Sequence, residues 1–575
     1  MRIGLFFFFL IFLLGCSQKP QPIADARLND YALYDEKGNF HRFSYYNDSK
    51  GIVLFVQGNG CPIVRAARED FQEIVDEFSK KGFTFFMINS NIQDTRESIQ
   101  KETEAYPFPV PVLVDNAQVV ANMLDITITA EVFILHPTTR EILYRGPINN
   151  KFDYETQKSK SGEEYVKEAL SQILNNKPPI SKKQQTRGCK VTRWQEIEKQ
   201  PITYTGEIGT IVTEHCAICH HEGGIGPWSM NDYNTLLGWS AMMKQVLLTQ
   251  RMPPWKADPK VGHFKKSFAL SNEDRRKIIT WIDEGMPYGE GVDPLSLLEF
   301  TDHEWKGGAP DKIITLQKEE IPANGTIPYR YQTIRVSLEE DTWIKGIEIK
   351  PSNPKVMHHI LITNKESNKQ SPIISRPPRK WIDNFIALGA MGSQYIGYPD
   401  GSGVFFPKNA ELIVQIHYAP TGKPEEDETQ IGLYFSDQVP EKEFLSLAPA
   451  NTTFEIPPFG KEVKIVAEDS IEKDILLHYV VPHMHYRGKS IKFKVQFPNG
   501  ETKTVVSVAD YNFNWQQLYQ LEEALPIPKS SKIIVEGIFD NTYQNPFNPD
   551  PNKTVHFGLQ STDEMLIGFF NYTLQ

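Results

Sequence analysis

Short apolar segments that alternate with polar residues dominate the chain after Pro310 and constrain its fold most strongly. Alternation with a period of two is typical of strands with one buried face, and regularly spaced strands indicate β-sandwiches. No cysteine follows residue 219, so packing alone must hold these strands together. About 265 residues are enough for two such domains. We expect them, as jelly-roll-like sandwiches, over residues 310–440 and 441–575, with their clearest strands at 342–349, 411–416, 475–481, 491–495 and 532–537.

Length and charge bound the rest of the molecule. The 575 residues suggest about four domains. The chain has 61 basic and 72 acidic side chains, a net charge of −11, and this balance argues against a nucleic-acid-binding protein, which needs a basic face. Hydrophobic residues (40%) and charged residues (23%) occur in globular proportions, which excludes long disordered or fibrous architectures.

Five of the fourteen histidines stand in arrangements that composition does not explain. His358 and His359 are adjacent, His417 ends an expected strand, and His483 and His485 are two residues apart. Residues i and i+2 share one face of a strand, whereas adjacent residues face opposite sides. Joint binding of one ion by His358 and His359 therefore requires a bulge or a strand end.

Near the C-terminus comes Met565, in Asp563-Glu564-Met565. The ordered set His-His, Gln-x-His-Tyr, His-x-His-x-x-Gly-Lys and Asp-Glu-Met resembles the type II copper monooxygenases, such as the peptidylglycine α-hydroxylating and dopamine β-monooxygenases. The resemblance covers roughly residues 310–575 and implies two uncoupled copper ions. The electron-transfer ion would be held by His358, His359 and His417. The catalytic ion, where O₂ binds, would be held by His483, His485 and Met565.

Three further positions bear on the substrate. By the same resemblance, the peptide-hydroxylating relatives grip a substrate carboxylate with an Arg, an Asn and a Tyr. The matching positions in this chain are Val481, Ile567 and Phe569. Apolar side chains cannot form a bidentate grip on an anion. We therefore expect an uncharged, more apolar small-molecule substrate, and not peptide amidation.

Cys216-Ala-Ile-Cys219-His220 is a C-x-x-C-H motif. Its spacing lets both sulfurs bond the haem vinyl groups while the imidazole reaches the iron. Zinc is the alternative, but it needs two more ligands and no further cysteine follows. The surrounding sequence resembles class I cytochrome c, with a helix before the motif and a capped closing helix expected over 271–284. We therefore expect an all-α domain over residues 201–295 with one covalent haem c.

The sixth iron ligand is expected to be Met252, in the proline-rich loop Arg251-Met252-Pro253-Pro254-Trp255. A thioether opposite histidine raises the potential of haem iron and favours electron transfer over O₂ binding. Three other methionines compete for the role: Met242, Met243 and Met286. The first two share a helical spacing with two leucines, which favours a place in the core.

Residues 25–178 alternate expected strands and helices. A buried strand ends at a turn, and Cys61-Pro62 then opens a helix over 65–80. This order resembles the thioredoxin and peroxiredoxin superfamily, in which the helix dipole stabilises a thiolate at the position of Cys61.

The matching positions for the superfamily's other active residues are occupied differently. Val64 stands where thioredoxins have a second cysteine, and Ala130 where a cis-proline is usual. Leu54 and Gly58 stand where peroxiredoxins have Pro and Thr. We therefore expect a docking or scaffold domain without dithiol exchange or peroxide reduction. A bond from Cys61 to Cys189, the pair left once lipid and haem take the other three cysteines, stays open, since sequence cannot show proximity.

The first sixteen residues contain one Arg, an unbroken apolar run and Leu13-Leu14-Gly15-Cys16. So short a run is an export signal rather than a membrane span, and no other run approaches ~18 apolar residues. The last four residues resemble a bacterial lipoprotein box, which implies that Cys16 is lipidated and anchors the chain outside the cytoplasm; an ordinary signal with a chance cysteine is the alternative. Ser17, in place of the Asp associated with inner-membrane retention, favours the outer membrane, with the chain facing the periplasm or the surface of the cell envelope.

The sequence thus predicts a signal segment (1–16), a thioredoxin-like α/β domain (25–178), a linker (179–200), an all-α cytochrome c domain and two all-β copper domains. The predicted function is that of an exported, lipid-anchored copper monooxygenase that hydroxylates a C–H bond with O₂. Electrons from an external donor would pass through the haem to the dicopper centre. The alternative is an electron-transfer or copper-handling lipoprotein without hydroxylase turnover.

Overall fold

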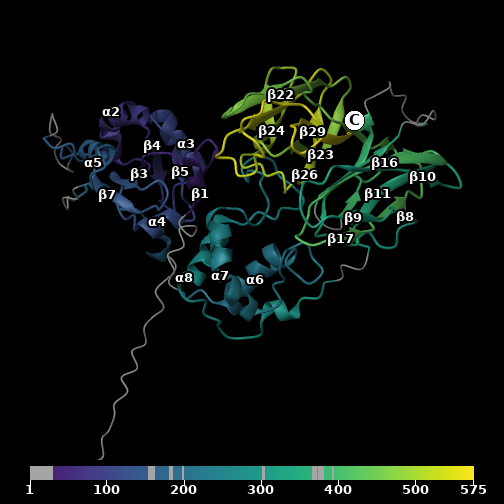
Figure 1. Cartoon of the computed structure of the whole chain (residues 1–575), viewed down its shortest axis with the longest axis horizontal. Helices are drawn as coiled ribbons and strands as arrows, with labels where there is room; N and C mark the ends of the chain where they lie inside the picture. Colours follow the sequence, from purple (N-terminus) through teal and green to yellow (C-terminus); the bar gives the residue numbers. More distant parts are fainter. Residues whose placement is uncertain are drawn as a thin grey trace, which may run out of the picture.

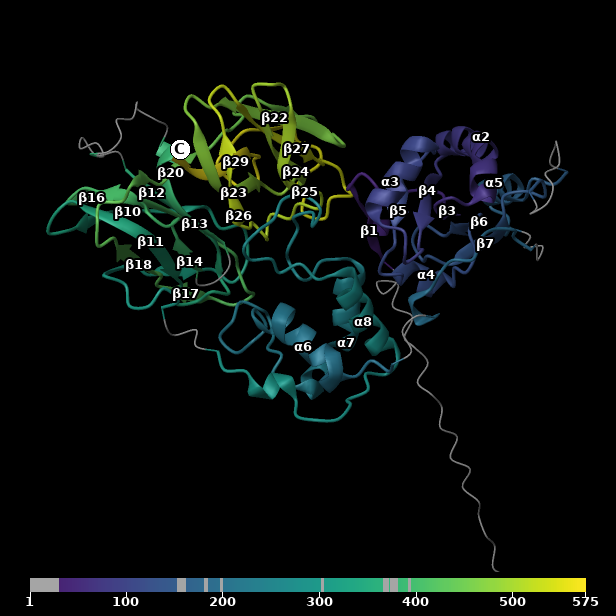
Figure 2. The same cartoon turned by 180° about the vertical axis from the view of Figure 1, so that it is seen from behind.

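The structure, a computed structural model, describes residues 30–152, 162–179, 185–196, 200–300, 305–365, 372, 381–390 and 394–575. The expected signal segment and Cys16 lie outside these residues. No helix within the described ranges is both long and apolar enough to cross a membrane. Figures 1 and 2 show an α/β unit (purple) at one end, a β unit (green) at the other end and a second β unit (yellow) between these two, with a helical segment (teal) along one side.

The α/β unit is built on a five-stranded sheet in the order β5-β4-β3-β6-β7, in which β3, β4 and β5 are parallel and β6 and β7 antiparallel. This confirms the expected alternation of strands and helices. The expected helix over 65–80 begins earlier, because Pro62 occupies its first turn, and it is split at Ala67. The elements are β1 (Ala32–Tyr34), β2 (Phe40–Arg42), β3 (Ile52–Gln57), α1 (Pro62–Ala66), α2 (Arg68–Phe78), β4 (Thr84–Asn89), α3 (Arg96–Ala105), β5 (Val112–Val114), α4 (Val119–Leu124), β6 (Glu131–Leu135), β7 (Ile142–Pro147) and α5 (Tyr165–Leu174).

The helical segment follows residues 185–196. Its closing helix begins where the sequence predicts, since the Ser271 hydroxyl accepts a hydrogen bond from the Asp274 backbone N–H at 3.0 Å. One apolar cluster runs from the sheet of the α/β unit through Val191 and Trp194 to this segment, so the two share a core. The helices are α6 (Gly209–Val212), α7 (Tyr233–Leu248) and α8 (Asn272–Asp283), with π-helical turns at Tyr204–Ile208 and Thr213–Ala217.

Each β unit has two main sheets that share one apolar cluster. In the first unit the sheet orders are β10-β16-β12-β13 and β19-β15-β11-β18-β8, with β14 paired to β11. Its strands are β8 (Lys312–Thr315), β9 (Glu319–Ile321), β10 (Arg330–Ser337), β11 (Thr342–Lys350), β12 (Met357–Asn364), β13 (Phe385–Ala390), β14 (Gln394–Gly397), β15 (Ser402–Phe406), β16 (Asn409–Tyr418), β17 (Glu425–Asp427), β18 (Gln430–Phe435) and β19 (Lys442–Glu443).

In the second β unit the sheet orders are β20-β29-β23-β26 and β22-β27-β24-β25. All five strands named from the sequence are present and extend one to three residues beyond the expected bounds, which confirms the alternation pattern in both units. The strands of the second unit are β20 (Leu445–Leu447), β21 (Glu455–Ile456), β22 (Val463–Ser470), β23 (Ile475–Met484), β24 (Gly488–Gln496), β25 (Thr502–Val508), β26 (Tyr519–Ile527), β27 (Lys532–Phe539), β28 (Val555–His556) and β29 (Leu566–Leu574).

The loop between α7 and α8 joins three of the units. Its residues Ala257 and Phe264 form β-bridges to Val508 and Leu521 of the second β unit. Both carboxylate oxygens of Asp258 in the same loop accept hydrogen bonds from Nη1 of Arg96 in the α/β unit, at 2.8 and 2.9 Å. This one loop therefore contacts both the α/β unit and the second β unit.

Candidate metal centre

Two of the predicted ligands are cross-strand partners. β12 and β16 are antiparallel, and His359 lies directly opposite His417 in their register. The register shifts between Met357 and His359, so His358 occupies a bulge. A bulge turns one side chain away from the strict alternation of a strand. The sequence analysis required a bulge or a strand end for joint binding by His358 and His359, and the bulge is present.

His358, His359 and His417 meet in a buried cluster. Their ligand atoms all lie within 4.8 Å of one another, and the Nδ1 atoms of His358 and His359 are 2.9 Å apart. Among the described residues, the buried Nδ1 of His417 has no hydrogen-bond partner. An unsatisfied buried nitrogen costs about 1–3 kcal/mol. Three convergent nitrogens, one of them unpaired, fit a metal ion.

Burial keeps these three imidazoles neutral. Desolvation lowers the pKa of His358 to about 4 and that of His417 to about 3, and it lowers the pKa of His359 well below its usual range. The neighbouring imidazoles lower the pKa of His359 further. A neutral imidazole has the lone pair that a metal requires, so all three side chains are ready to bind without first losing a proton.

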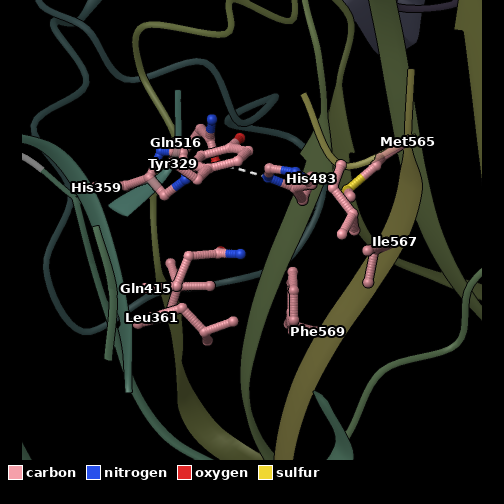
Figure 3. A pocket seen from close by; sticks show the side chains of 11 residues that line it. Tyr329, His359, Leu361, Gln415, His483, Gln516, Met565, Ile567 and Phe569 are labelled. Atoms are coloured by element: carbon pink, nitrogen blue, oxygen red, sulfur yellow. Dashed lines mark hydrogen bonds between the residues drawn. The ribbon is translucent and has the colours of Figure 1, made fainter. Parts of the chain in front are cut away.

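The second predicted set lies at the end of β23. His483 and His485 have ring centroids 5.2 Å apart and perpendicular ring planes. His483 pairs with Ile567 across β23 and β29, which brings Met565, just before β29, to the same end of the sheet. Met565 and His483 line one pocket, and Figure 3 shows the Met565 sulfur on the side of His483.

Two hydrogen bonds set the tautomers of this second pair. The Nδ1–H of His483 donates to the Gln516 side-chain oxygen at 2.7 Å, and the Nδ1–H of His485 donates to the Asp563 carbonyl at 3.3 Å. Each bond leaves Nε2 with its lone pair. Desolvation lowers the pKa of His483 to about 4 and that of His485 well below its usual range. The pair is thus neutral and oriented for a metal.

The two histidine sets are neighbours. The rings of His359 and His483 lie 6.0 Å apart. The ring of Tyr329 lies 4.8 Å from His417 and 5.6 Å from His359, and its hydroxyl donates to Nε2 of His485 at 3.4 Å. The expectation that the two ions are uncoupled stays a prediction. Imidazoles of both sets surround Tyr329, and we call this buried space the enclosure.

Sequence reasoning missed three residues of this enclosure. Tyr329 precedes β10, while Phe513 and Gln516 lie in the loop before β26. Phe513 stacks on His358 with ring centroids 4.7 Å apart. None of the three belongs to a motif with a ligand-type residue, so the sequence contains no local signal that would have found them.

A buried carboxyl group supports the loop that carries His485. Glu564 accepts the backbone N–H groups of His485 at 3.0 Å and of Arg487 at 2.5 Å. Burial raises the pKa of Glu564 to about 8, despite these hydrogen bonds and the charge of Arg487, which lower it. Glu564 therefore acts as a positioning residue for His485.

The pocket at the second set is largely apolar. None of its lining residues is an Asp, Glu, Lys or Arg, and beside the histidines its polar groups are those of Tyr329, Gln415 and Gln516. Ile567 and Phe569, two of the positions singled out in the sequence, line it (Figure 3). The third, Val481, lies with Met565 in the apolar cluster that joins the two β units. The other lining residues are His359, Leu361, Leu388, His483, Leu559 and Met565.

The C-x-x-C-H motif begins within the π-helical turn Thr213–Ala217, which contains Cys216. The Nδ1–H of His220 donates to the Trp228 carbonyl at 3.0 Å, which leaves Nε2 with its lone pair, and burial lowers the pKa of His220. Cys216 and Cys219 are free thiols and are half-buried. A neutral, oriented imidazole beside two thiols fits covalent haem attachment.

Apolar side chains are exposed beside this motif. Trp239 of α7 stacks on Trp228, which in turn contacts His220. Met242, one helical turn further on, is 49% exposed, so its expected place in the core was wrong. Neighbouring helix positions point about 100° apart, and only Met243 of that pair faces the core. Met286 is buried as well, while Met252 is half-buried in the loop after α7.

The remaining predicted pair also comes together. The Sγ atoms of Cys61 and Cys189 lie 3.0 Å apart, although both are free thiols. The peptide bond before Ala130 is trans, and Ala130 has a φ of +60°. The loop that usually carries a cis-proline thus reaches Cys61 through Thr129 instead.

Comparison with known proteins assigns two parts of the chain. Residues 450–574 match the model of the copper type II ascorbate-dependent monooxygenase C-terminal domain, and residues 23–148 match that of the AhpC/TSA family. The chain therefore contains a redoxin domain of thioredoxin-like fold and a copper type II monooxygenase C-terminal domain.

Several solved structures are similar over part of the chain. A hypothetical protein from Sinorhizobium meliloti 1021 is 24% identical, with 29% of this chain and 91% of that chain covered and a TM-score of 0.26. An uncharacterized conserved protein from Geobacillus kaustophilus is 24% identical over 30% and 92%, with a TM-score of 0.27. The peroxidoxin BcpB from Mycobacterium tuberculosis is 19% identical over 26% and 92%, with a TM-score of 0.20.

Proposed function

We propose that this protein is a copper-dependent monooxygenase that hydroxylates a C–H bond of a small, uncharged molecule. The overall reaction takes one O₂, two electrons and two protons, and yields the hydroxylated product and water. The observation that supports it best is that five buried, neutral histidines lie close together, and that two of them, His359 and His483, line a largely apolar pocket with Met565.

Two copper ions would be held by six side chains. The first ion would bind His358, His359 and His417, and the second His483, His485 and Met565. Bound copper would supply one-electron transfer and O₂ reduction, and the single thioether would favour the reduced state that meets O₂. The proposal agrees with the family match of the C-terminal domain.

The protein's own residues prepare this site. Gln516 and the Asp563 carbonyl hold the tautomers of the two histidines, and Glu564 holds the backbone of His485. Leu361, Leu388, Ile567 and Phe569 exclude water and would place an apolar part of the substrate beside His483 and Met565. The lining offers no cation for a carboxylate, which favours an uncharged substrate over a peptide C-terminus.

We also propose one covalent haem c bound by Cys216 and Cys219, with His220 and Met252 as axial ligands. The hydrogen bond from His220 to Trp228 and the exposed apolar face of α7 support this. The haem would supply one-electron transfer from an external donor. The loop that contains Met252 continues directly into the bridges to β25 and β26, so the helical segment and the copper domain are in contact.

The proposed location is the cell envelope, with Cys16 lipidated and the outer membrane favoured. The Leu-Leu-Gly-Cys sequence and the apolar run before it support this proposal. Mass spectrometry of the mature N-terminus tests it: a diacylated or triacylated Cys16 supports the anchor, and an unmodified chain that begins elsewhere contradicts it.

The decisive experiment measures metal and haem content together with O₂ reactivity on purified mature protein. We expect two copper ions and one haem per chain, and haem that O₂ reoxidises rapidly only when copper is bound. One copper or none, with a haem indifferent to copper, would overturn the monooxygenase in favour of an electron carrier.

A further inference from the structure

A second reactive site lies outside the metal centre, where a buried and an exposed thiol meet. Cys61 precedes α1 and is 2% exposed, whereas Cys189 is exposed on the segment 185–196. Their sulfur atoms are in contact at 3.0 Å, although 128 residues separate them in the sequence. Neither thiol has a role in the proposed copper chemistry.

Thr129 organises the pair. Its hydroxyl lies 3.1 Å from the Cys61 sulfur and accepts a hydrogen bond from the Cys189 backbone N–H at 2.8 Å. The Thr129 backbone N–H donates to the Cys189 carbonyl at 2.8 Å. One residue thus fixes the position of both thiols.

The segment that carries Cys189 is held without any bond between sulfurs. Ile128 and Lys190 form an antiparallel bridge, and the Val191 N–H donates to the Thr127 carbonyl at 2.9 Å. Farther along, the Trp194 N–H donates to the buried side chain of Gln118 at 2.9 Å. Because these backbone bonds involve neither sulfur, they keep the two sulfurs adjacent when both thiols are reduced.

Gly188 makes this close approach possible. A Cβ at this position would lie 1.9 Å from the Thr129 carbonyl oxygen. Real Cβ atoms do not approach backbone oxygens so closely, so any larger residue would push the segment away from Thr129. The spacing of the two thiols therefore depends on a glycine that is not itself reactive.

The two thiols differ in acidity and access. Burial alone would raise the pKa of Cys61, but hydrogen bonds with Thr129 and Cys189 bring it below its usual value. Burial and the bond to Cys61 raise the pKa of Cys189 to about 11. The sulfur with the lower pKa leaves faster in thiol–disulfide exchange, and the accessible sulfur is the one attacked.

We propose that Cys61 and Cys189 form a reversible disulfide that exchanges electrons with an external dithiol protein. A thiolate of the partner attacks the exposed sulfur of Cys189, the Cys61–Cys189 bond breaks, and Cys61 leaves as a thiolate. The partner's second thiolate then attacks its own sulfur in the mixed disulfide, and Cys189 leaves and takes up a proton. Two electrons pass from the partner, which ends as a disulfide, to this chain.

The test uses the full haem-loaded chain in buffers of oxidised and reduced dithiothreitol, with free thiols counted by alkylation and mass spectrometry. We expect Cys61 and Cys189 to lose and regain their thiols together, in one two-electron transition. Two thiols that stay free in fully oxidised buffer, or a bond that dithiothreitol cannot reduce without denaturant, would overturn the proposal.

Gly188→Ala tests the geometry while both thiols remain. We expect the equilibrium constant for disulfide formation to fall about tenfold or more. Gly162→Ala in the same unit is the matched control, since its added Cβ meets only ordinary contacts at 3.5 Å or more. Equal constants for the two variants would contradict the role assigned to Gly188 and the fixed approach of the segment.

The site of attack is tested with a thioredoxin whose second active cysteine is replaced by serine, which traps the mixed disulfide. We expect the trapped bond at Cys189, and a bond at Cys61 would overturn the assignment. Copper content, measured on the same samples, is independent of these results and reports separately on the proposed monooxygenase.

Discussion

The candidate metal centre and the cysteine pair both bring together side chains that are distant in sequence, but the first is buried and the second is partly exposed. At both sites, antiparallel pairing makes the contact: His359 and His417 across two strands, Cys189 and Thr129 across a short bridge. The histidines are buried and neutral, which suits ions that stay bound. One of the two sulfurs is exposed, which suits a partner that comes and goes. Access, more than proximity, separates a cofactor site from an exchange site.

The largest effect is expected when a metal ligand is removed. His417→Ala should lower copper content by one ion per chain and reduce hydroxylation at least a hundredfold, since one electron can no longer be stored. His556→Ala, which changes an exposed histidine in the same chain, is the control. Metal analysis and product assays check both, and full activity of His417→Ala would contradict the site.

Met565→Leu should abolish hydroxylation with little change in stability, because leucine keeps the volume but lacks the thioether. The three-histidine site should still bind copper, so total copper falls from two ions towards one. Met484→Leu, at a buried methionine that is absent from the pocket lining, is the matched control. If the Met565 variant hydroxylates at the normal rate, the sulfur is not a ligand.

Gln516→Leu should weaken copper binding at the second site by about 10–100-fold, since the hydrogen bond that sets the His483 tautomer is lost. Gln516→Glu retains an acceptor and should restore most of the affinity. Copper titration of the two variants checks this. Equal affinities for the leucine and glutamate variants would show that the tautomer of His483 does not matter.

The copper-free protein should lose stability as the pH falls below about 6.5. His358, His417 and His483 stay neutral in the fold down to pH 3–4, whereas the unfolded chain binds protons from about pH 6.5. The unfolding free energy then falls by about 1.4 kcal/mol per pH unit for each histidine. Glu564, with its raised pKa, works in the opposite direction and offsets one histidine. Denaturant titrations from pH 7 to 5 measure the slope, and His417→Ala should reduce it by about one proton.

The smallest effect is expected when the cysteine pair is changed and the activity of the metal site is measured. Cys61→Ser should remove the reversible disulfide but leave copper content and the hydroxylation rate unchanged when reductant is supplied directly. The same assays that report on His417→Ala check this. A large loss of hydroxylation would contradict the independence of the sites and would place the thiol pair on the electron path.

Sequence patterns with a fixed spacing led to correct structural expectations. The bulge at His358 and the capped helix after Ser271 follow from local rules. Ile567 and Phe569, which line the pocket, were found through the resemblance to the copper monooxygenases. Tyr329 and Gln516 could not be found this way, because loops bring them to the site and loops have no period. They required the tertiary structure.

The contact between Cys61 and Cys189 is a second feature that local sequence rules could not predict. The sequence argument against dithiol chemistry rested on the absence of a second cysteine within one helical turn of Cys61. The partner comes instead from a segment beyond the domain, 128 residues later. Sequence rules for thiol pairs describe the common spacing, whereas contact through a bridged segment depends on the fold.

The loop between α7 and α8 has a consequence for how the chain can be divided. Ala257 and Phe264 bridge to β25 and β26, and these are the outer strands of the two sheets in the second β unit. Outer strands with free backbone groups invite pairing with other chains. The helical segment thus acts as a cover against aggregation. A fragment that begins after residue 305 and contains only the two β units would leave both edges uncovered. A fragment that also retains residues 250–268 would keep these bridges.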